Sequence, residues 1–195
     1  MKQKGSTSKG FTLVELAIVL VIIGLILGAM LKAQELIKNA KTKRLYSQYN
    51  EVVASIHTYY DKYGVFPGDD PNAANRWNNT SSGNGNGIIE NLSTTCTDAS
   101  TNESCLAWEH LRLANILTGS GKNAPRNPYG GGVGIGQATV QGLTTHWIAF
   151  DTIPGEVCEY IDRQYDDGVA ATGTIRGDDD YTADPNTTYT LYIRL

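Results

Sequence analysis

A segment of 21 almost wholly apolar residues, Phe11–Leu31, constrains this chain more than any other feature. An α-helix rises 1.5 Å per residue, so this segment would form a helix about 31 Å long, which matches the hydrocarbon core of a bilayer. The only charged side chain within it is Glu15. The segment therefore predicts a membrane-spanning helix with a carboxylate inside the span.

Two common kinds of N-terminal apolar segment explain only part of this pattern. A secretory signal peptide also has lysines before an apolar core, but the core here is longer than usual. A plain membrane anchor explains the length and leaves Glu15 unexplained, because a carboxylate in the membrane is energetically costly. Glu15 lies one helical turn after Phe11. In a chain that began at Phe11, the carboxylate could pair with the α-ammonium of its own or a neighbouring subunit. These features favour a helix that assembles with others.

The sequence Gly10-Phe11-Thr12-Leu13-Val14-Glu15 resembles the processing motif of type IV pilins and type II secretion pseudopilins. The resemblance implies that residues 1–10 are a leader, removed by cleavage between Gly10 and Phe11. It also implies that Phe11 is then N-methylated and that Glu15 is the assembly residue. The implied partners are identical or homologous pilin subunits, the prepilin peptidase and methyltransferase, the pilus or secretion assembly machinery, and the membrane.

The resemblance further implies a location. The precursor would cross the bacterial inner membrane once, with its head outside the cytoplasm, and would then enter a pilus or a periplasmic pseudopilus. Charge counting does not support this orientation, because five basic residues follow the span and only three precede it. The five that follow are Lys32, Lys38, Lys41, Lys43 and Arg44. The expected orientation therefore depends on the resemblance.

The rest of the chain predicts an α+β, pilin-like fold. Residues 34–63 contain no Gly or Pro and place apolar side chains at helical spacing, so residues 32–63 should continue the helix in amphipathic form until Gly64. Residues 64–195 then form the globular head. Further helices are predicted at 105–117 and after Pro154, a loop at 124–136, and strands at 145–151, 173–177 and 189–195. The order of these elements matches that of pilins, and the resemblance implies that the long helix packs on a C-terminal antiparallel sheet with long loops.

Charge and motifs in the head argue against two classes of function. From Leu45 to the end there are 18 acidic and 8 basic residues, and this excess of negative charge would repel a nucleic acid backbone. His57, His110 and His146 are isolated from any nucleophile or metal-ligand spacing. We therefore expect neither nucleic-acid binding nor an enzyme.

The cysteines and the acidic loops give weaker signals. Cys96, Cys105 and Cys158 lack the spacing of a zinc site and predict one disulfide and one free thiol in an oxidising compartment. The pairing Cys96–Cys105 is preferred, although sequence alone does not fix the connectivity. No cofactor is expected. Calcium is the one metal considered, with Asp166 and Asp167 as candidate ligands, while residues 82–93 partly fit a calcium loop but lack its closing acid.

These observations together predict a structural subunit of a type IV pilus or type II secretion pseudopilus, polymerising through its N-terminal helix after processing. The alternative is a monomeric membrane-anchored adhesin or ligand-binding module that uses a pilin-type signal for export.

Overall fold

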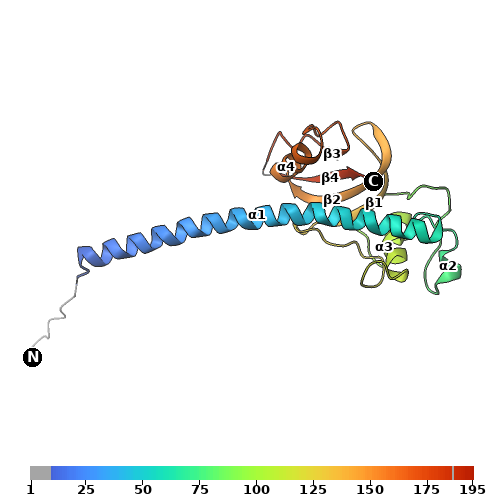
Figure 1. The fold of residues 1–195 in the computed structure, drawn as a ribbon, viewed down its shortest axis with the longest axis horizontal. Helices are drawn as coiled ribbons and strands as arrows, with labels where there is room; N and C mark the ends of the chain where they lie inside the picture. Colours follow the sequence, from blue (N-terminus) through green and yellow to red (C-terminus); the bar gives the residue numbers. More distant parts are fainter. Residues whose placement is uncertain (1–9, 186) are drawn as a thin grey trace, which may run out of the picture. The chain divides into compact units, whose positions relative to one another are not determined.

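The computed structural model describes residues 10–185 and 187–195, so leader residues 1–9 lie outside the described part of the chain. It divides into two units, Met1–Ala40 and Lys41–Leu195. Helix α1, Leu13–Tyr63, belongs to both. The fold is α+β and pilin-like: the second part of the long helix packs on a small antiparallel sheet (Figure 1).

In the first unit, α1 leaves its apolar side chains exposed from Leu13 to Ile37. Among the described residues, α1 is the one helix long and apolar enough to cross a membrane. This observation agrees with the spanning segment predicted from the sequence.

In the second unit, α1 becomes amphipathic. Its buried stripe includes Leu45, Val52, Ile56 and Tyr59, spaced at helical intervals. Gly64 follows the helix with a positive φ of 74°, the left-handed conformation that commonly ends helices.

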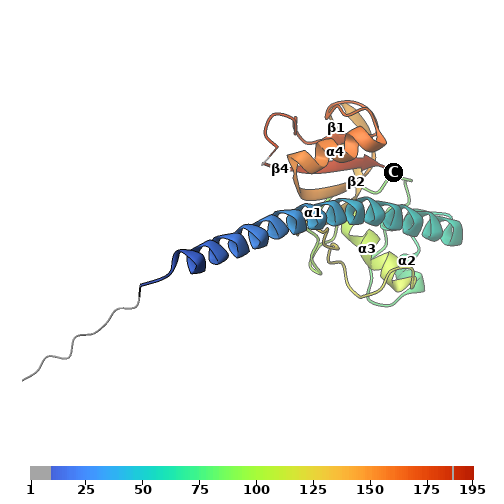
Figure 2. The ribbon, with the colours of Figure 1, turned by 60° about the vertical axis from the view of Figure 1, so that its left-hand side comes forward.

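The sheet has four antiparallel strands in the order β1-β2-β4-β3. They are β1 (Val133–Val140), β2 (Leu143–Pro154), β3 (Ile175–Gly177) and β4 (Thr188–Arg194). Ile148 of β2 pairs with Ile135 of β1 and with Ile193 of β4, so these three side chains share one face. In Figure 2 this sheet lies beside the second part of α1.

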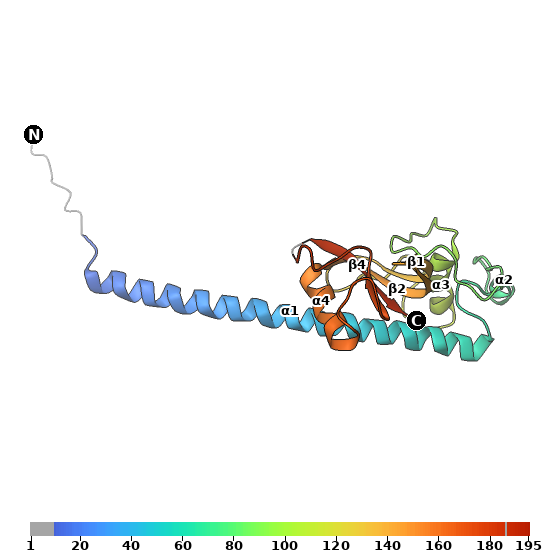
Figure 3. The same cartoon turned by 90° about the horizontal axis from the view of Figure 1, so that it is seen from above.

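Three shorter helices complete the second unit: α2 (Ala73–Arg76), α3 (Glu103–Leu113) and α4 (Gly155–Tyr165). Trp108 and Leu111 of α3 and Val157 and Ile161 of α4 are buried in the same core as the α1 stripe and the sheet. Figure 3 shows α2 and α3 near the last turns of α1.

Two predicted elements need correction. Residues 124–136 are not all loop, because β1 begins at Val133. The helix expected to reach Leu117 ends at Leu113, since Asn115 adopts a positive φ of 57° that the helix cannot continue through.

Glycines explain why β1 was missed. Gly134 alternates with Val133 and Ile135, which weakens the pattern of a strand in the sequence. A Cβ at Gly134 would lie 2.6 Å from the carbonyl oxygen of Ser93, so glycine lets the preceding loop lie directly against the strand.

Candidate functional site

The candidate processing and assembly site lies at the start of α1. Residues 10–12 are not helical, and the side chain of Phe11 is 82% exposed. The bond between Gly10 and Phe11, at which cleavage is predicted, therefore lies in an exposed, irregular stretch directly before the helix.

Thr12 and Glu15 form a reciprocal pair of hydrogen bonds around the first turn. The backbone N–H and the hydroxyl of Thr12 each donate to Oε2 of Glu15 at 2.8 Å, and the N–H of Glu15 donates to Oγ1 of Thr12 at 3.2 Å. This arrangement is a capping box, which satisfies backbone donors that a helix start leaves without partners. The side chain of Glu15 is thus held at the N-terminal end of the span, on the side of Phe11.

A buried carboxylate, which the sequence did not identify, brings together two segments of the head: Phe66–Asp70 and residues 83–87. Asp69, from the segment Phe66–Asp70, is 1% exposed. Its Oδ1 accepts hydrogen bonds from the N–H groups of Gly85 (2.7 Å) and Asn86 (3.0 Å), and its Oδ2 accepts one from Gly87 (2.8 Å). The loop at residues 83–87 therefore folds around an anion supplied by the chain itself.

This geometry changes the interpretation of residues 82–93, which partly resemble a calcium loop. The side-chain oxygens expected to face a cation accept hydrogen bonds instead: Asn84 from the N–H of Asn86, and Asn86 from that of Ile88. A Cβ at Gly83 would overlap the backbone of Gly68 and Asp69, so glycine is needed for this close approach. The loop is built to surround Asp69.

Buried groups on α3 hold the same region. Glu103 accepts from the N–H groups of Asn84 (2.9 Å) and Glu90 (3.0 Å). His110, with 0% exposure, accepts from the N–H of Gly68 through Nδ1 at 3.0 Å, and its Nε2 lies 2.9 Å from the carbonyl oxygen of Ser81. Burial lowers the pKa of His110, and these two bonds suit the neutral ring that donates from Nε2.

The cysteines form the pairing that was preferred from the sequence. Cys96 and Cys105 form a disulfide that ties the loop before α3 to the first turn of that helix, and Cys158 is a buried free cysteine on α4. Burial raises the pKa of the Cys158 thiol, which keeps it protonated and unreactive.

The predicted calcium ligands lie beside a third acid. Ligand atoms of Asp162, Asp166 and Asp167 are within 4.8 Å of one another. Each carboxylate, however, accepts hydrogen bonds from the loop that follows: Asp162 from the N–H of Gly168, Asp166 from that of Ile175, and Asp167 from that of Val169. The cluster organises this loop through donors from the chain itself, and calcium binding by Asp166 and Asp167 is untested.

Comparison with known proteins bears on the N-terminal site. Residues 5–31 match the family described as the prokaryotic N-terminal methylation motif. No curated protein and no solved structure matches the chain. The chain thus carries the N-terminal signal of type IV pilins and pseudopilins, as predicted from Gly10 to Glu15. Such a signal suggests a structural protein, and together with the long apolar helix it fits a membrane-anchored precursor.

Proposed function

We propose that this protein is a structural subunit of a type IV pilus or a type II secretion pseudopilus that polymerises through α1. The observation that carries the proposal is Glu15, the only charged residue in the apolar segment Phe11–Leu31, within a matched methylation motif. A monomeric anchor gains only a helix cap from a carboxylate at this position, whereas a helix bundle can also use it to select and align its members.

In the proposed pathway, a membrane peptidase cleaves after Gly10 and the new terminus at Phe11 is methylated. The backbone N–H and the hydroxyl of Thr12 both donate to Oε2 of Glu15. Oε1 can then receive the α-ammonium of Phe11 from an incoming subunit without breaking the capping box. The pairing places a positive and a negative charge together in an apolar bundle, where each would be costly alone.

This chain would supply the helix, the charge pair and the head, while an ATPase motor and the assembly platform would supply the work of polymerisation. The second candidate is the monomeric membrane-anchored adhesin or ligand-binding module. It would share the cleavage at Gly10 but would need no pairing partner for Glu15.

Mass spectrometry of the protein from its native host tests the processing step. We expect a mature chain that begins with N-methylated Phe11. An intact leader on protein found in filaments would contradict the proposal. A residue larger than Gly at position 10 should block cleavage, because a peptidase subsite must approach the backbone there.

Purification of surface or periplasmic filaments, with and without this gene, tests the structural role. A major subunit would account for most of the filament mass. A minor or priming subunit would be scarce, but filament number would fall in its absence. Processed protein that stays monomeric in the membrane, with filaments unaffected by its loss, would favour the adhesin.

A further inference from the structure

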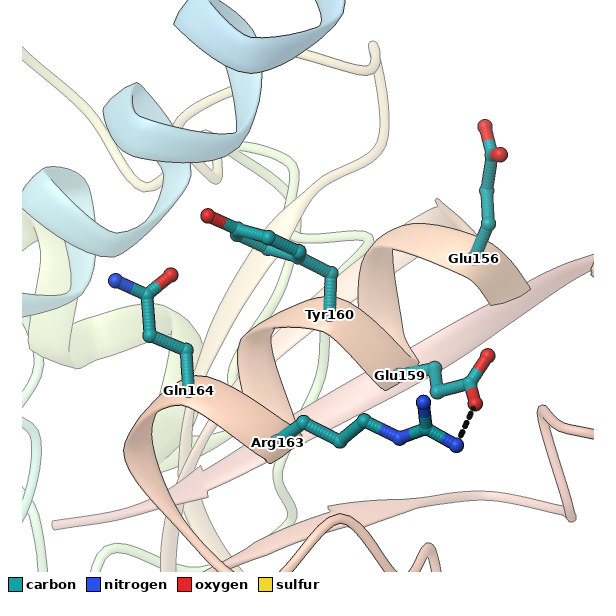
Figure 4. A pocket seen from close by; sticks show the side chains of 5 residues that line it. All are labelled: Glu156, Glu159, Tyr160, Arg163 and Gln164. Carbon is teal, nitrogen blue, oxygen red and sulfur yellow. Dashed lines mark ion pairs between the residues drawn. The ribbon is translucent and has the colours of Figure 1, made fainter.

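The outer face of α4 is a surface without an assigned role. Among the described residues of the second unit, four large hydrophobic side chains are exposed, and three lie on α4 or just after it: Tyr160 (53%), Val169 (51%) and Tyr165 (42%), whose ring stacks on Tyr46 of α1. The helix borders a hollow of about 440 Å³. Figure 4 shows its lining side chains, which are Glu156, Glu159, Tyr160, Arg163 and Gln164.

This surface is strongly negative. Residues 156–184, here called the acidic face, contain nine acids, of which Asp162 is buried, and only two basic residues, a net charge of −7. Arg163 pairs with Glu159 at 2.5 Å, and Arg176 donates to the backbone carbonyl of Gln141 at 2.8 Å. Asp179 and Asp180 line the same hollow as residues 168–171, so the two acidic loops adjoin each other. The acidic face therefore holds most of the net charge of −10 between Leu45 and Leu195.

The opposite charge is concentrated in α1, directly after the apolar span. Residues 32–44, here called the basic collar, contain five basic side chains and one acid, a net charge of +4. Lys32, Leu36 and Lys43 fall within about 40° of one another around the helix, at 100° per residue. All three side chains are exposed, and Leu36 is 59% exposed. The collar thus offers a side with both apolar and positive groups.

In the expected orientation, the basic collar also opposes membrane insertion of the precursor. Basic residues close to a span favour the cytoplasmic side, so five of them beyond the span oppose export of the head. If the basic collar stabilises the assembled filament, that stabilisation explains why the chain carries it.

We propose that in the filament the acidic face of one subunit docks on the basic collar of a second copy of this chain. The inference rests on the proposed polymerisation through α1. Packing of segments 11–31 side by side with an axial offset would bring one subunit's collar level with a neighbour's head. Lysines of the collar would meet the carboxylates of the acidic face, and Leu36 would meet exposed side chains such as Tyr160.

A second copy fits this surface better than a lipid surface does. Anionic headgroups could attract the collar, but they would repel a face of charge −7 and leave it without a partner. Docking between copies uses both surfaces and balances their charges.

Charge exchange in the full-length protein tests the proposal. The collar variant carries Lys32→Glu and Lys43→Glu, and the face variant carries Glu156→Lys and Asp179→Lys; all four residues are exposed. We expect each variant alone to lower filament yield about tenfold or more, because the collar variant leaves the collar with no net charge and the face variant lowers the charge of the acidic face to −3, so the attraction between the two surfaces weakens. The combined fourfold variant has the net charge of the native chain, and we expect it to restore most of the yield.

Matched controls are Lys62→Glu and Asp61→Lys, exposed residues at the far end of α1, which we expect to leave filament yield unchanged. Yield is divided by the amount of processed protein in the membrane. Native filaments should also weaken in about 1 M salt, where the screening length falls to about 3 Å.

Three results would overturn the docking proposal. They are normal filaments from the collar variant, normal filaments from the face variant, and a loss that the fourfold variant does not repair, each judged by the yield per processed protein in the membrane. A native chain that is processed but never polymerises would overturn the proposed function itself, and this outcome is separate because it is seen without any substitution.

Discussion

The backbone N–H of Gly68 donates a 3.0 Å hydrogen bond to Nδ1 of His110, a residue 42 positions away on α3. Through its other nitrogen, 2.9 Å from the carbonyl oxygen of Ser81, the same ring contacts a second loop segment. A single neutral imidazole thus joins α3 to both ends of the segment that contains α2.

This arrangement predicts that mild acid destabilises the head. Burial is the main cause that lowers the pKa of His110 below its usual value, and burial lowers the pKa of His146 in the same way. A lowered native pKa means that the unfolded chain binds more protons. The stabilisation is therefore complete above about pH 6.5 and is lost as the pH falls from there through the native pKa.

Thermal unfolding of the full chain in detergent, followed between pH 7.5 and pH 5 (roughly the range over which histidine titrates), measures the effect. We expect Tm to fall as the pH decreases and to fall less steeply in His110→Asn, which keeps an acceptor near Gly68 but does not titrate. His57→Asn, at an exposed position, serves as the control and should keep the native slope. Equal slopes in all three proteins would contradict the prediction.

Asp69 gives a second prediction about stability. Asp69→Asn would turn an amide N–H₂ toward at least one of the three backbone donors that the carboxylate now accepts from. A buried donor left without an acceptor costs about 1–3 kcal/mol, so we expect a loss of that order in the free energy of unfolding. Asp61→Asn at an exposed position of α1 should change it little. Chemical denaturation of both variants makes the comparison, and similar stabilities would show that the loop does not depend on Asp69.

The sequence predicted the parts of the fold whose pattern is local. The apolar span and the Gly-free stretch to Tyr63 specify α1 by composition and period, and alternation at Tyr189, Leu191 and Ile193 specifies β4. The loop around Asp69 could not be predicted in this way, since its acceptor and its donors come from separate motifs that meet only in the fold. Alternating glycines at 83, 85 and 87, after the two aspartates at 69 and 70, were the available signal.

The candidate site residues also differ in whether the sequence alone could identify them. Gly10, Phe11 and Glu15 are adjacent in sequence, so their motif could be identified directly, and the capping box with Thr12 follows from their spacing. Asp162, by contrast, joins Asp166 and Asp167 through the end of α4, and no sequence motif marks it as a ligand. Its burial was not visible in a sequence that places it among exposed acids.

Calcium binding can be tested at these three acids. Backbone N–H groups and the hydroxyl of Thr172 already donate to the carboxylates, so we expect no shift in Tm between millimolar calcium and a chelator. Asp167→Asn provides the comparison, because it removes one ligand from an exposed position. A rise in Tm with calcium that is lost in Asp167→Asn, and that magnesium does not reproduce, would establish a site.

The cysteines give a prediction that needs no substitution. Peptide mapping of exported protein under non-reducing conditions should recover Cys96 linked to Cys105. Cys158 should react with an alkylating reagent only after denaturation, because it is fully buried and its raised pKa keeps the thiol protonated. Three alkylatable thiols in the exported protein would show that the disulfide does not form in its compartment.

The last prediction concerns how Glu15 separates insertion from assembly. Glu15→Val removes a charge from the span, so membrane insertion of the precursor should be unharmed or improved. Docking should fail, because the α-ammonium of an incoming Phe11 would then enter an apolar bundle without a partner, at a cost of several kcal/mol. Glu15→Gln should assemble only in part, since an amide accepts a hydrogen bond but does not neutralise the ammonium.

The measurement is filament yield divided by processed protein in the membrane. Thr12→Val, which removes the side-chain half of the capping box but keeps the carboxylate, is the matched control, and it should reduce yield less than Glu15→Val. Normal filaments from Glu15→Val would show that this carboxylate is not the assembly contact.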